Sequence, residues 1–248
     1  ILDAVHGSMA GDLFVAPPPH RPYIEELDHD PGQLRVAMLV HDPFLGFEVL
    51  PEVVQAVEMT GKIFADRGDT VDYGYPPAFD GKSGLGFGGA ILGSSGLAAT
   101  LDAWSERTGK PITQDDVEPA TWERAEQGRS WTAVQVHEAY QRLVAGICQT
   151  TQWWADGIDL LITSTLAQPP APLGLDGEEL FRHVGLFTMP FSYSGQPAIS
   201  LPLHWSRDGL PIGVQIVADY GREDLLIRVA SMLEQVQPWK DRLPPNFG

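Results

Sequence analysis

Apolar residues in the first third of the chain predict a strand, a helix and a second strand. A nearly unbroken apolar run over residues 34–40 is typical of a buried strand. The next apolar positions have helical spacing, and we expect a helix that begins with Pro51 and stops at Gly68. Residues 70–73 then predict another strand. This order indicates a crossover between parallel strands.

The last third has the pattern of a hairpin followed by a helix. Residues 197–205 and 211–218 predict two strands, and the Asp208-Gly209 pair between them suits a tight turn. A final helix is expected from Glu223 onward, with its apolar residues on one face. Residues 158–163 predict one further buried strand. Strands therefore lie on both sides of the central part of the chain.

That central part, about residues 84–154, is predicted to be mostly helical. Breaks are expected near residues 109–111 and around Gly128. Thr113 and Asp116 have the spacing of a capping box, which predicts the start of a helix there rather than a catalytic carboxylate.

The first residues suggest that more sequence precedes them. ILDAVHG predicts a helical turn that stops at Gly7, yet neither a methionine nor a capping residue stands before it. We therefore expect this sequence to be a fragment that begins inside a helix. Residues 11–33, rich in proline and acidic residues, predict an extended crossing segment.

Composition excludes several classes of partner. The 248 residues carry 33 acidic and 16 basic side chains, a formal charge of −17, which would repel a nucleic acid or an anionic membrane. Cys148 is the single cysteine, and no apolar run reaches the roughly 18 residues that span a bilayer. These features predict a cytoplasmic protein that binds neither nucleic acid nor membrane.

A serine-containing motif, GGAILGSSGLAAT over residues 88–100, raises the question of a nucleophile. The elbow pattern G-x-S-x-G is missed at Ser94 because position 92 is leucine. Lys82 acting as a base for Ser94 or Ser95 is one alternative. A helix of small residues packed closely against another backbone is the favoured interpretation, and a helix that lines a pocket built elsewhere is the third.

Other local motifs do not support a cofactor. Residues 80–83, DGKS, lack the first glycine of a phosphate-binding loop because position 76 is proline. The seven histidines include no i, i+4 pair around an acid, and Cys148 has no cysteine partner at ligand spacing. We expect no metal and no nucleotide.

Motifs in the C-terminal third resemble the amidase signature family. The pattern F-T-x-P-F-x-x-x-G-x-P begins at Phe187, D-G-x-P-x-G-x-Q begins at Asp208, and GREDLL begins at Gly221. Residues 8–19, 112–122 and 159–174 are similar to other segments of the same half of that family, in the same order. Within the family, the chain is similar to amidases of the nylon-oligomer and 6-aminohexanoate type.

The resemblance implies an α/β fold, with a mixed β-sheet covered by helices on both faces. Residues 1–248 would then form the C-terminal half of a single amidase-signature domain. Amide hydrolysis would follow the family's Ser–cis-Ser–Lys mechanism through an acyl-enzyme, without a cofactor. None of the triad motifs aligns with this chain, so the resemblance assigns no catalytic residue here and places the triad in an upstream N-terminal half of the same protein.

This half would instead form one wall of a pocket for a small amide. The substrate-binding candidates are Ser94, Thr165, Phe191 and Ser192. Ser192 departs from the family, in which asparagine commonly follows this Pro-Phe pair. For each candidate, ordinary packing or turn structure is an equal explanation.

Two further functions stay open from the sequence. One is the glutamine-hydrolysing subunit of a tRNA-dependent amidotransferase, although the negative charge does not favour a tRNA-facing role. The other is a non-catalytic relative that binds a ligand or acts as a scaffold. The sequence does not identify the amide substrate, and it leaves the oligomeric state open, a homodimer included.

Overall fold

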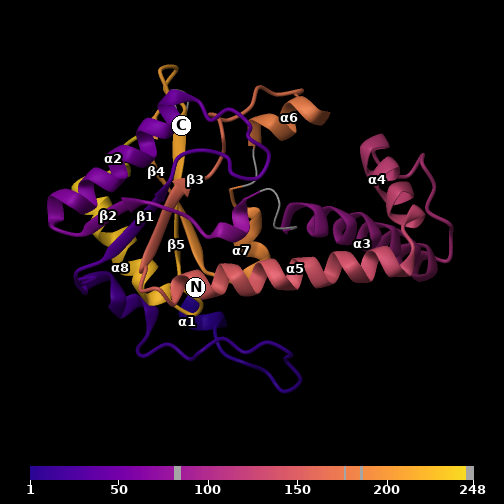
Figure 1. Cartoon of the computed structure of the whole chain (residues 1–248), viewed down its shortest axis with the longest axis horizontal. Helices are drawn as coiled ribbons and strands as arrows, with labels where there is room; N and C mark the ends of the chain where they lie inside the picture. Colours follow the sequence, from indigo (N-terminus) through magenta and orange to yellow (C-terminus); the bar gives the residue numbers. More distant parts are fainter. Residues whose placement is uncertain (81–84, 176, 185–186, 244–248) are drawn as a thin grey trace. The chain divides into compact units, whose positions relative to one another are not determined.

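The chain folds into two units, each with its own core (Figure 1). The structure, a computed structural model, describes residues 1–80, 85–175, 177–184 and 187–243. The sheet unit comprises Ile1–Asp42, Gly46–Tyr75 and Thr151–Gly248, and the helical unit comprises Pro43–Leu45 and Pro76–Thr150.

One mixed sheet of five strands forms the centre of the sheet unit. The strands are β1 (Arg35–Leu39), β2 (Thr70–Tyr73), β3 (Leu160–Ser164), β4 (Ala198–Trp205) and β5 (Pro211–Ala218). Their order is β2-β1-β3-β5-β4, with β1 parallel to β2 and β3, and β5 antiparallel to β3 and β4. The predicted parallel crossover and the predicted hairpin are both confirmed, and the α/β class with them.

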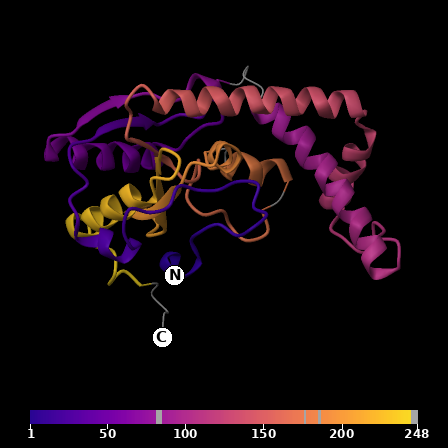
Figure 2. The same cartoon turned by 90° about the horizontal axis from the view of Figure 1, so that it is seen from below.

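Helices α2 (Pro51–Arg67) and α8 (Glu223–Val236) cover one face of this sheet. Proline suits the first turn of α2, and Gly68 ends it in the left-handed conformation. Both helices place their apolar residues in one core with every second residue of the strands, and Figure 2 shows α2 in purple and α8 in yellow within this unit. Phe64 of α2 is completely buried there.

The predicted extended segment, residues 11–33, includes a short 3₁₀ helix, η1 (Tyr23–Asp28), that packs on α8. Glu26 of η1 is buried, and Arg228 of α8 donates to its carboxylate at 2.6 Å. Ser231 donates to the carbonyl of Leu27 at 2.7 Å. A charge-assisted hydrogen bond to a buried carboxylate therefore joins this segment to α8. The first helix, α1, spans Leu2–Val5.

Asp224 in the first turn of α8 makes the stability of this unit depend on pH. Burial opposes ionisation of this carboxyl, but hydrogen bonds and positive charge from Arg222, together with Arg228, outweigh burial and hold its pKa below the ordinary value. A lowered folded-state pKa stabilises the fold above the unfolded value of about 3.9, and this stability is lost as the pH falls through the folded value.

Asp224→Asn is therefore expected to lower the urea midpoint at pH 7 and to have a much smaller effect at pH 2.5. Asp66→Asn is the control, because the Asp66–Lys62 pair is exposed and such pairs contribute little. If Asp224→Asn lowered the urea midpoint by the same amount at both pH values, the charge of Asp224 would not contribute to stability.

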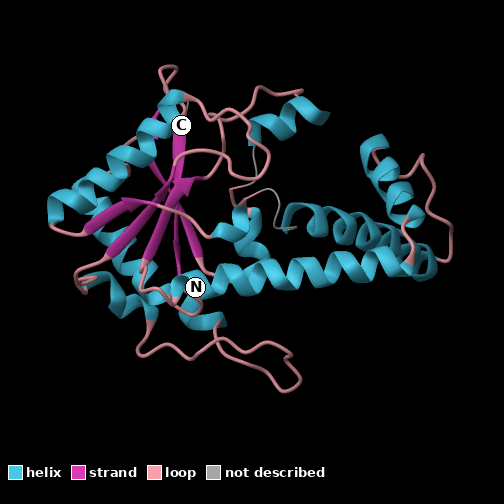
Figure 3. Ribbon diagram, in the orientation of Figure 1, coloured by secondary structure: helices cyan, strands magenta, loops and turns pink. Residues whose placement is uncertain are grey.

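The helical unit contains α3 (Leu85–Thr108), α4 (Pro119–Ser130), most of α5 (Ala133–Trp154) and the 3₁₀ helix η2 (Pro77–Phe79). Its described residues include no strand, as the colouring of Figure 3 shows. One prediction was wrong in detail: Thr113 donates to Asp116 in a turn before α4, which begins only at Pro119. The break expected around Gly128 lies at residues 131–132, just after the end of α4 at Ser130.

Two short helices in the sheet unit were not predicted, α6 (Gly177–Val184) and α7 (Met189–Ser194). Gly195 ends α7 in the left-handed conformation, which only glycine adopts without strain. Across the described residues, no helix combines the length and the apolar character needed to cross a membrane.

Candidate functional site

Polar side chains gather on the second face of the sheet, at the edge where β1 and β3 end. Residues on this face alternate with those of the α2–α8 core. In the strand register, Thr163 lies opposite Gln215, which lies opposite Ser200. The neighbouring row on this face is apolar, with Leu161 opposite Val217. The face thus changes from apolar to polar toward the carboxyl ends of parallel strands, where α/β proteins commonly bind ligands.

Thr165 and Ser200 meet across the glycine of β5. Their hydroxyl oxygens are 2.6 Å apart, and the amide of Thr165 donates to the carbonyl of Gly213 at 3.0 Å. A Cβ at Gly213 would lie 2.8 Å from each hydroxyl oxygen, closer than real Cβ contacts. The absence of a side chain at Gly213 therefore allows the two hydroxyls to approach each other.

A small cavity of about 100 Å³ opens beside this hydroxyl pair. Its walls come from the end of β3 and the loop after it, and from β4 and β5: Thr165, Leu166, Gln168, Pro170, Ser200, Pro211, Ile212 and Gly213. None of these side chains is ionisable at neutral pH. The loop is fixed where the amide of Leu50 donates to Ala167 and the amide of Ala167 donates to Val184.

The segment that carries two other candidates is held against the same face. Gln215, which is buried, donates from Nε2 to the carbonyl of Phe187 at 3.0 Å. On α7, Phe191 is buried, whereas Ser192 is exposed and its hydroxyl has only a 3.5 Å contact with the carbonyl of Thr188. Ser192 can therefore offer a hydroxyl outward, while Phe191 contributes packing.

Thr163 contributes a buried hydroxyl without a hydrogen-bond partner in the described part of the chain. An unsatisfied buried hydroxyl costs free energy, and removing it without changing the shape of the side chain is close to neutral or stabilising. Thr163→Val should therefore leave the thermal midpoint unchanged or raise it. A midpoint lowered by several degrees would mean that this hydroxyl has a partner, and Ser164→Ala provides the neighbouring control.

Ser94 lies in the helical unit, on α3, and is almost fully buried. Its hydroxyl donates to the carbonyl of Ile91 at 3.0 Å and accepts from Nε1 of Trp131 at 3.2 Å. The Ser95 hydroxyl is buried and has no hydrogen-bond partner among the described residues, so no described base contacts it. Lys82, the suggested base, falls outside the described residues.

Close packing around this motif agrees with the favoured interpretation. A Cβ at Gly88 would lie 2.8 Å from the carbonyl oxygen of Ala139 on α5, and one at Gly128 would lie 2.0 Å from that of Ser94. Gly96 has open space instead, so close approach does not involve every glycine of the motif.

Ser94→Ala should lower the free energy of unfolding by about 1–2 kcal/mol, because Trp131 loses the acceptor for its indole N–H. Urea unfolding followed by circular dichroism measures this cost, with Thr100→Ala, at an exposed position of the same helix, as the control. An unchanged midpoint would show that the Ser94–Trp131 hydrogen bond does not stabilise the unit.

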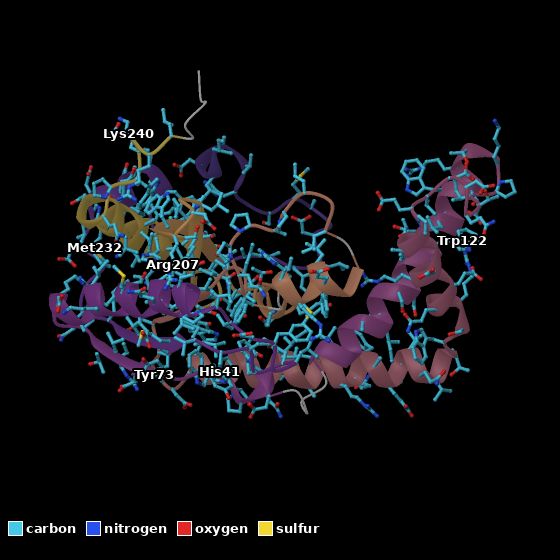
Figure 4. The ribbon with its side chains drawn as sticks, turned by 90° about the horizontal axis from the view of Figure 1, so that it is seen from above. His41, Tyr73, Trp122, Arg207, Met232 and Lys240 are labelled. Carbon is cyan, nitrogen blue, oxygen red and sulfur yellow. The ribbon has the colours of Figure 1, made fainter. Side chains whose placement is uncertain are left out.

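Sequence reasoning found Thr165 but missed the residues that complete the site. Ser200 and Gly213 sit in strands predicted only to shape the sheet, and the strand register was the signal that could have joined them. His41, labelled in Figure 4, follows β1 and packs edge-on against Tyr75, with ring centroids 5.2 Å apart. No described hydrogen bond joins Thr165 to α7.

The donor set does not suit a metal. Among the described residues, no three histidine, cysteine, aspartate or glutamate side chains group in a way that could hold an ion. The site at the end of β3 offers hydroxyl, amide and apolar groups, which bind neutral polar molecules better than cations.

Comparisons with known proteins assign the family. The amidase family model matches residues 1–227. The chain is 41% identical to the 6-aminohexanoate-cyclic-dimer hydrolase of Pseudomonas sp. (strain NK87) and 40% identical to that of Paenarthrobacter ureafaciens, in each case over 98% of this chain and 52% of the relative. A solved structure of 6-aminohexanoate cyclic dimer hydrolase superposes with a TM-score of 0.88 at 37% identity, covering 98% of this chain and 53% of that one.

The chain thus spans about half the length of the curated relatives it matches. The residues that the family model matches come from both units, and their range contains Thr165, Ser200 and α7. By sequence and by fold, this chain belongs to the amidase signature family.

Proposed function

We propose that this chain is the C-terminal half of an amide hydrolase. The observation that carries the proposal is the 41% identity to a 6-aminohexanoate-cyclic-dimer hydrolase along 98% of this chain, which amounts to only 52% of that enzyme. The catalytic serine, bridging serine and lysine would then lie in the half that precedes this one. In this proposal the chain contributes the sheet and one wall of the substrate pocket.

The chemistry would be nucleophilic. An unprotonated lysine would accept a proton through the bridging serine while the second serine attacks the amide carbonyl, and backbone N–H groups would stabilise the oxyanion. The amine leaves first, and water then hydrolyses the acyl-enzyme. Thr165, Phe191 and Ser192 would contact substrate in the sheet unit, and Ser94 would act through the packing of α3.

We further propose a cytoplasmic location and amides of aliphatic amino acids as substrates. The single cysteine, Cys148, supports a reducing compartment, and the name of the relatives makes the 6-aminohexanoate cyclic dimer the first substrate to assay. The formal charge of −17 argues against a nucleic-acid partner, and a homodimer is to be tested by mass in solution.

The test is to label the protein, expressed from its whole reading frame, with a serine-directed fluorophosphonate and to map the modified peptide by mass spectrometry. We expect label on a serine outside these 248 residues, together with release of amine from the cyclic dimer. Label on Ser94 or Ser95 would contradict the proposal that the catalytic serine lies in the preceding half of the protein. No label and no turnover would favour the non-catalytic alternative, and glutaminase activity that depends on a partner would favour the amidotransferase subunit.

A further inference from the structure

The hydroxyl pair at the end of β3 has an incomplete hydrogen-bond inventory. Thr165 and Ser200 together carry two O–H donors, and one of these is used in the 2.6 Å bond between them. The second O–H and the remaining lone pairs have no partner in the described part of the protein. The pair therefore presents one donor and at least one acceptor, side by side, at the wall of the cavity.

This combination matches a carboxamide better than a charged group. A primary carboxamide supplies a carbonyl acceptor and an N–H donor on the same side of one carbon atom, whereas a carboxylate only accepts and an ammonium only donates. The lining includes no ionisable side chain that could pair with a charge. Ser200 is exposed, so a charged group would keep part of its hydration here, but it would find no opposite charge and could use only one of the two hydrogen bonds open to a carboxamide.

The size of the cavity agrees with the binding of a carboxamide at one end of a substrate. Its volume of about 100 Å³ is roughly that of three water molecules, which suits the end of a substrate rather than a whole one. Leu166, Pro211 and Ile212 supply apolar walls for the methylene groups that would lead to the polar end. The site thus has a polar pair at one wall and apolar surface around it.

We propose that Thr165 and Ser200 form a subsite for an uncharged primary carboxamide of the substrate, separate from the amide that is cleaved. This inference rests on the proposed function for its enzymology, and it deepens that function by naming the substrate class. The enzyme would prefer substrates that carry a primary carboxamide at the end away from the cleaved amide, and it would discriminate against substrates that place a free carboxylate or ammonium at this position.

A binding experiment tests the subsite without requiring turnover. Hexanamide, hexanoate and hexylamine hydrochloride are titrated into the protein with labelled threonine methyl groups, and the shifts of the Thr165 methyl resonance are followed by NMR, with the ligand spectrum reporting any hydrolysis. We expect hexanamide to shift this resonance with a dissociation constant about tenfold lower than those of the two charged ligands. Equal affinity for all three, or no shift with hexanamide, contradicts the proposal.

Matched variants separate recognition from packing. Thr165→Val keeps the shape and removes the hydroxyl, so hexanamide should bind about tenfold more weakly, and Thr165→Ser should restore binding because it keeps the hydroxyl. Binding to the Val variant is followed through the methyl of the introduced valine, and binding to the Ser variant, which has no methyl at this position, through the resonances of the ligand. Gly213→Ala, whose Cβ would lie 2.8 Å from both hydroxyl oxygens, should also abolish binding. Unchanged binding in the Thr165→Val protein would overturn the role of the pair, and thermal midpoints verify that each variant is folded.

Kinetics then relate the subsite to the reaction. For an amide substrate with a distal carboxamide, Thr165→Val should raise KM about tenfold with little change in kcat, whereas for the analogue with a distal methyl group KM should rise much less. An equal loss with both substrates would indicate a structural role and contradict the proposal. Absence of turnover in the wild-type protein, with selective hexanamide binding intact, would refute the proposed function and leave the subsite standing.

Discussion

Gly128→Ala is expected to separate α4 from α3 and to destabilise the helical unit by about 3 kcal/mol. The added Cβ would lie 2.0 Å from the carbonyl oxygen of Ser94 and 2.9 Å from the amide nitrogen of Ser95. These are backbone atoms, so no side chain can rotate to relieve the contact and the helices must move apart. Alanine's better helix propensity offsets at most about 1 kcal/mol of this cost.

Hydrogen exchange of the α3 and α4 amides, combined with urea unfolding, measures the effect. Gly96→Ala is the matched control on α3, because its Cβ would meet open space. This control should be neutral or stabilising by about 0.5–1 kcal/mol through helix propensity. Equal urea midpoints and equal exchange rates for Gly128→Ala and Gly96→Ala would show that α3 and α4 do not pack as closely as described.

Phe64→Ala is expected to lower the free energy of unfolding of the sheet unit by about 3–5 kcal/mol. Phe64 is completely buried between α2 and the sheet, in the core that also contains α8. Truncation removes the transfer free energy of the ring and leaves a cavity that close-packed neighbours fill only in part.

The measurement is chemical denaturation followed by tryptophan fluorescence. Met59→Ala is the control on the same helix, because Met59 is 42% exposed and its truncation should cost less than about 1 kcal/mol. If Phe64→Ala lowered the free energy of unfolding no more than Met59→Ala does, Phe64 would not be packed in this core as described.

The sequence predicted most of the sheet and its covering helices because their patterns are local. The bounds of α2 and of β5 follow from apolar spacing, from the proline at the start of the helix and from the glycine after it. The short helices α6 and α7 escaped prediction because eight and six residues carry too little periodicity to stand out.

The site was less predictable for a different reason. Thr165 was a candidate through family resemblance, but its partner Ser200 is 35 residues away in sequence and reaches it only through the strand register. The space that Gly213 leaves for the two hydroxyls, because it has no side chain, likewise depends on the pairing between strands. At Thr113 and Asp116 a local pattern was present but misleading. Their capping-box spacing predicted the start of a helix, whereas the two residues form a turn ahead of α4, which begins at Pro119.

Most of the helical unit, Pro76–Thr150, lies between β2 and β3 in the chain, and this placement affects how the protein can change over evolution. The central pairing of Val36 with Leu160 closes a loop that contains the whole of that unit. Loop-closure entropy grows only with the logarithm of length, so that doubling a loop costs about 0.6 kcal/mol. Insertions and deletions between β2 and β3 are thus thermodynamically inexpensive, and a lineage could remodel this segment freely while β1 and β3 keep the same register.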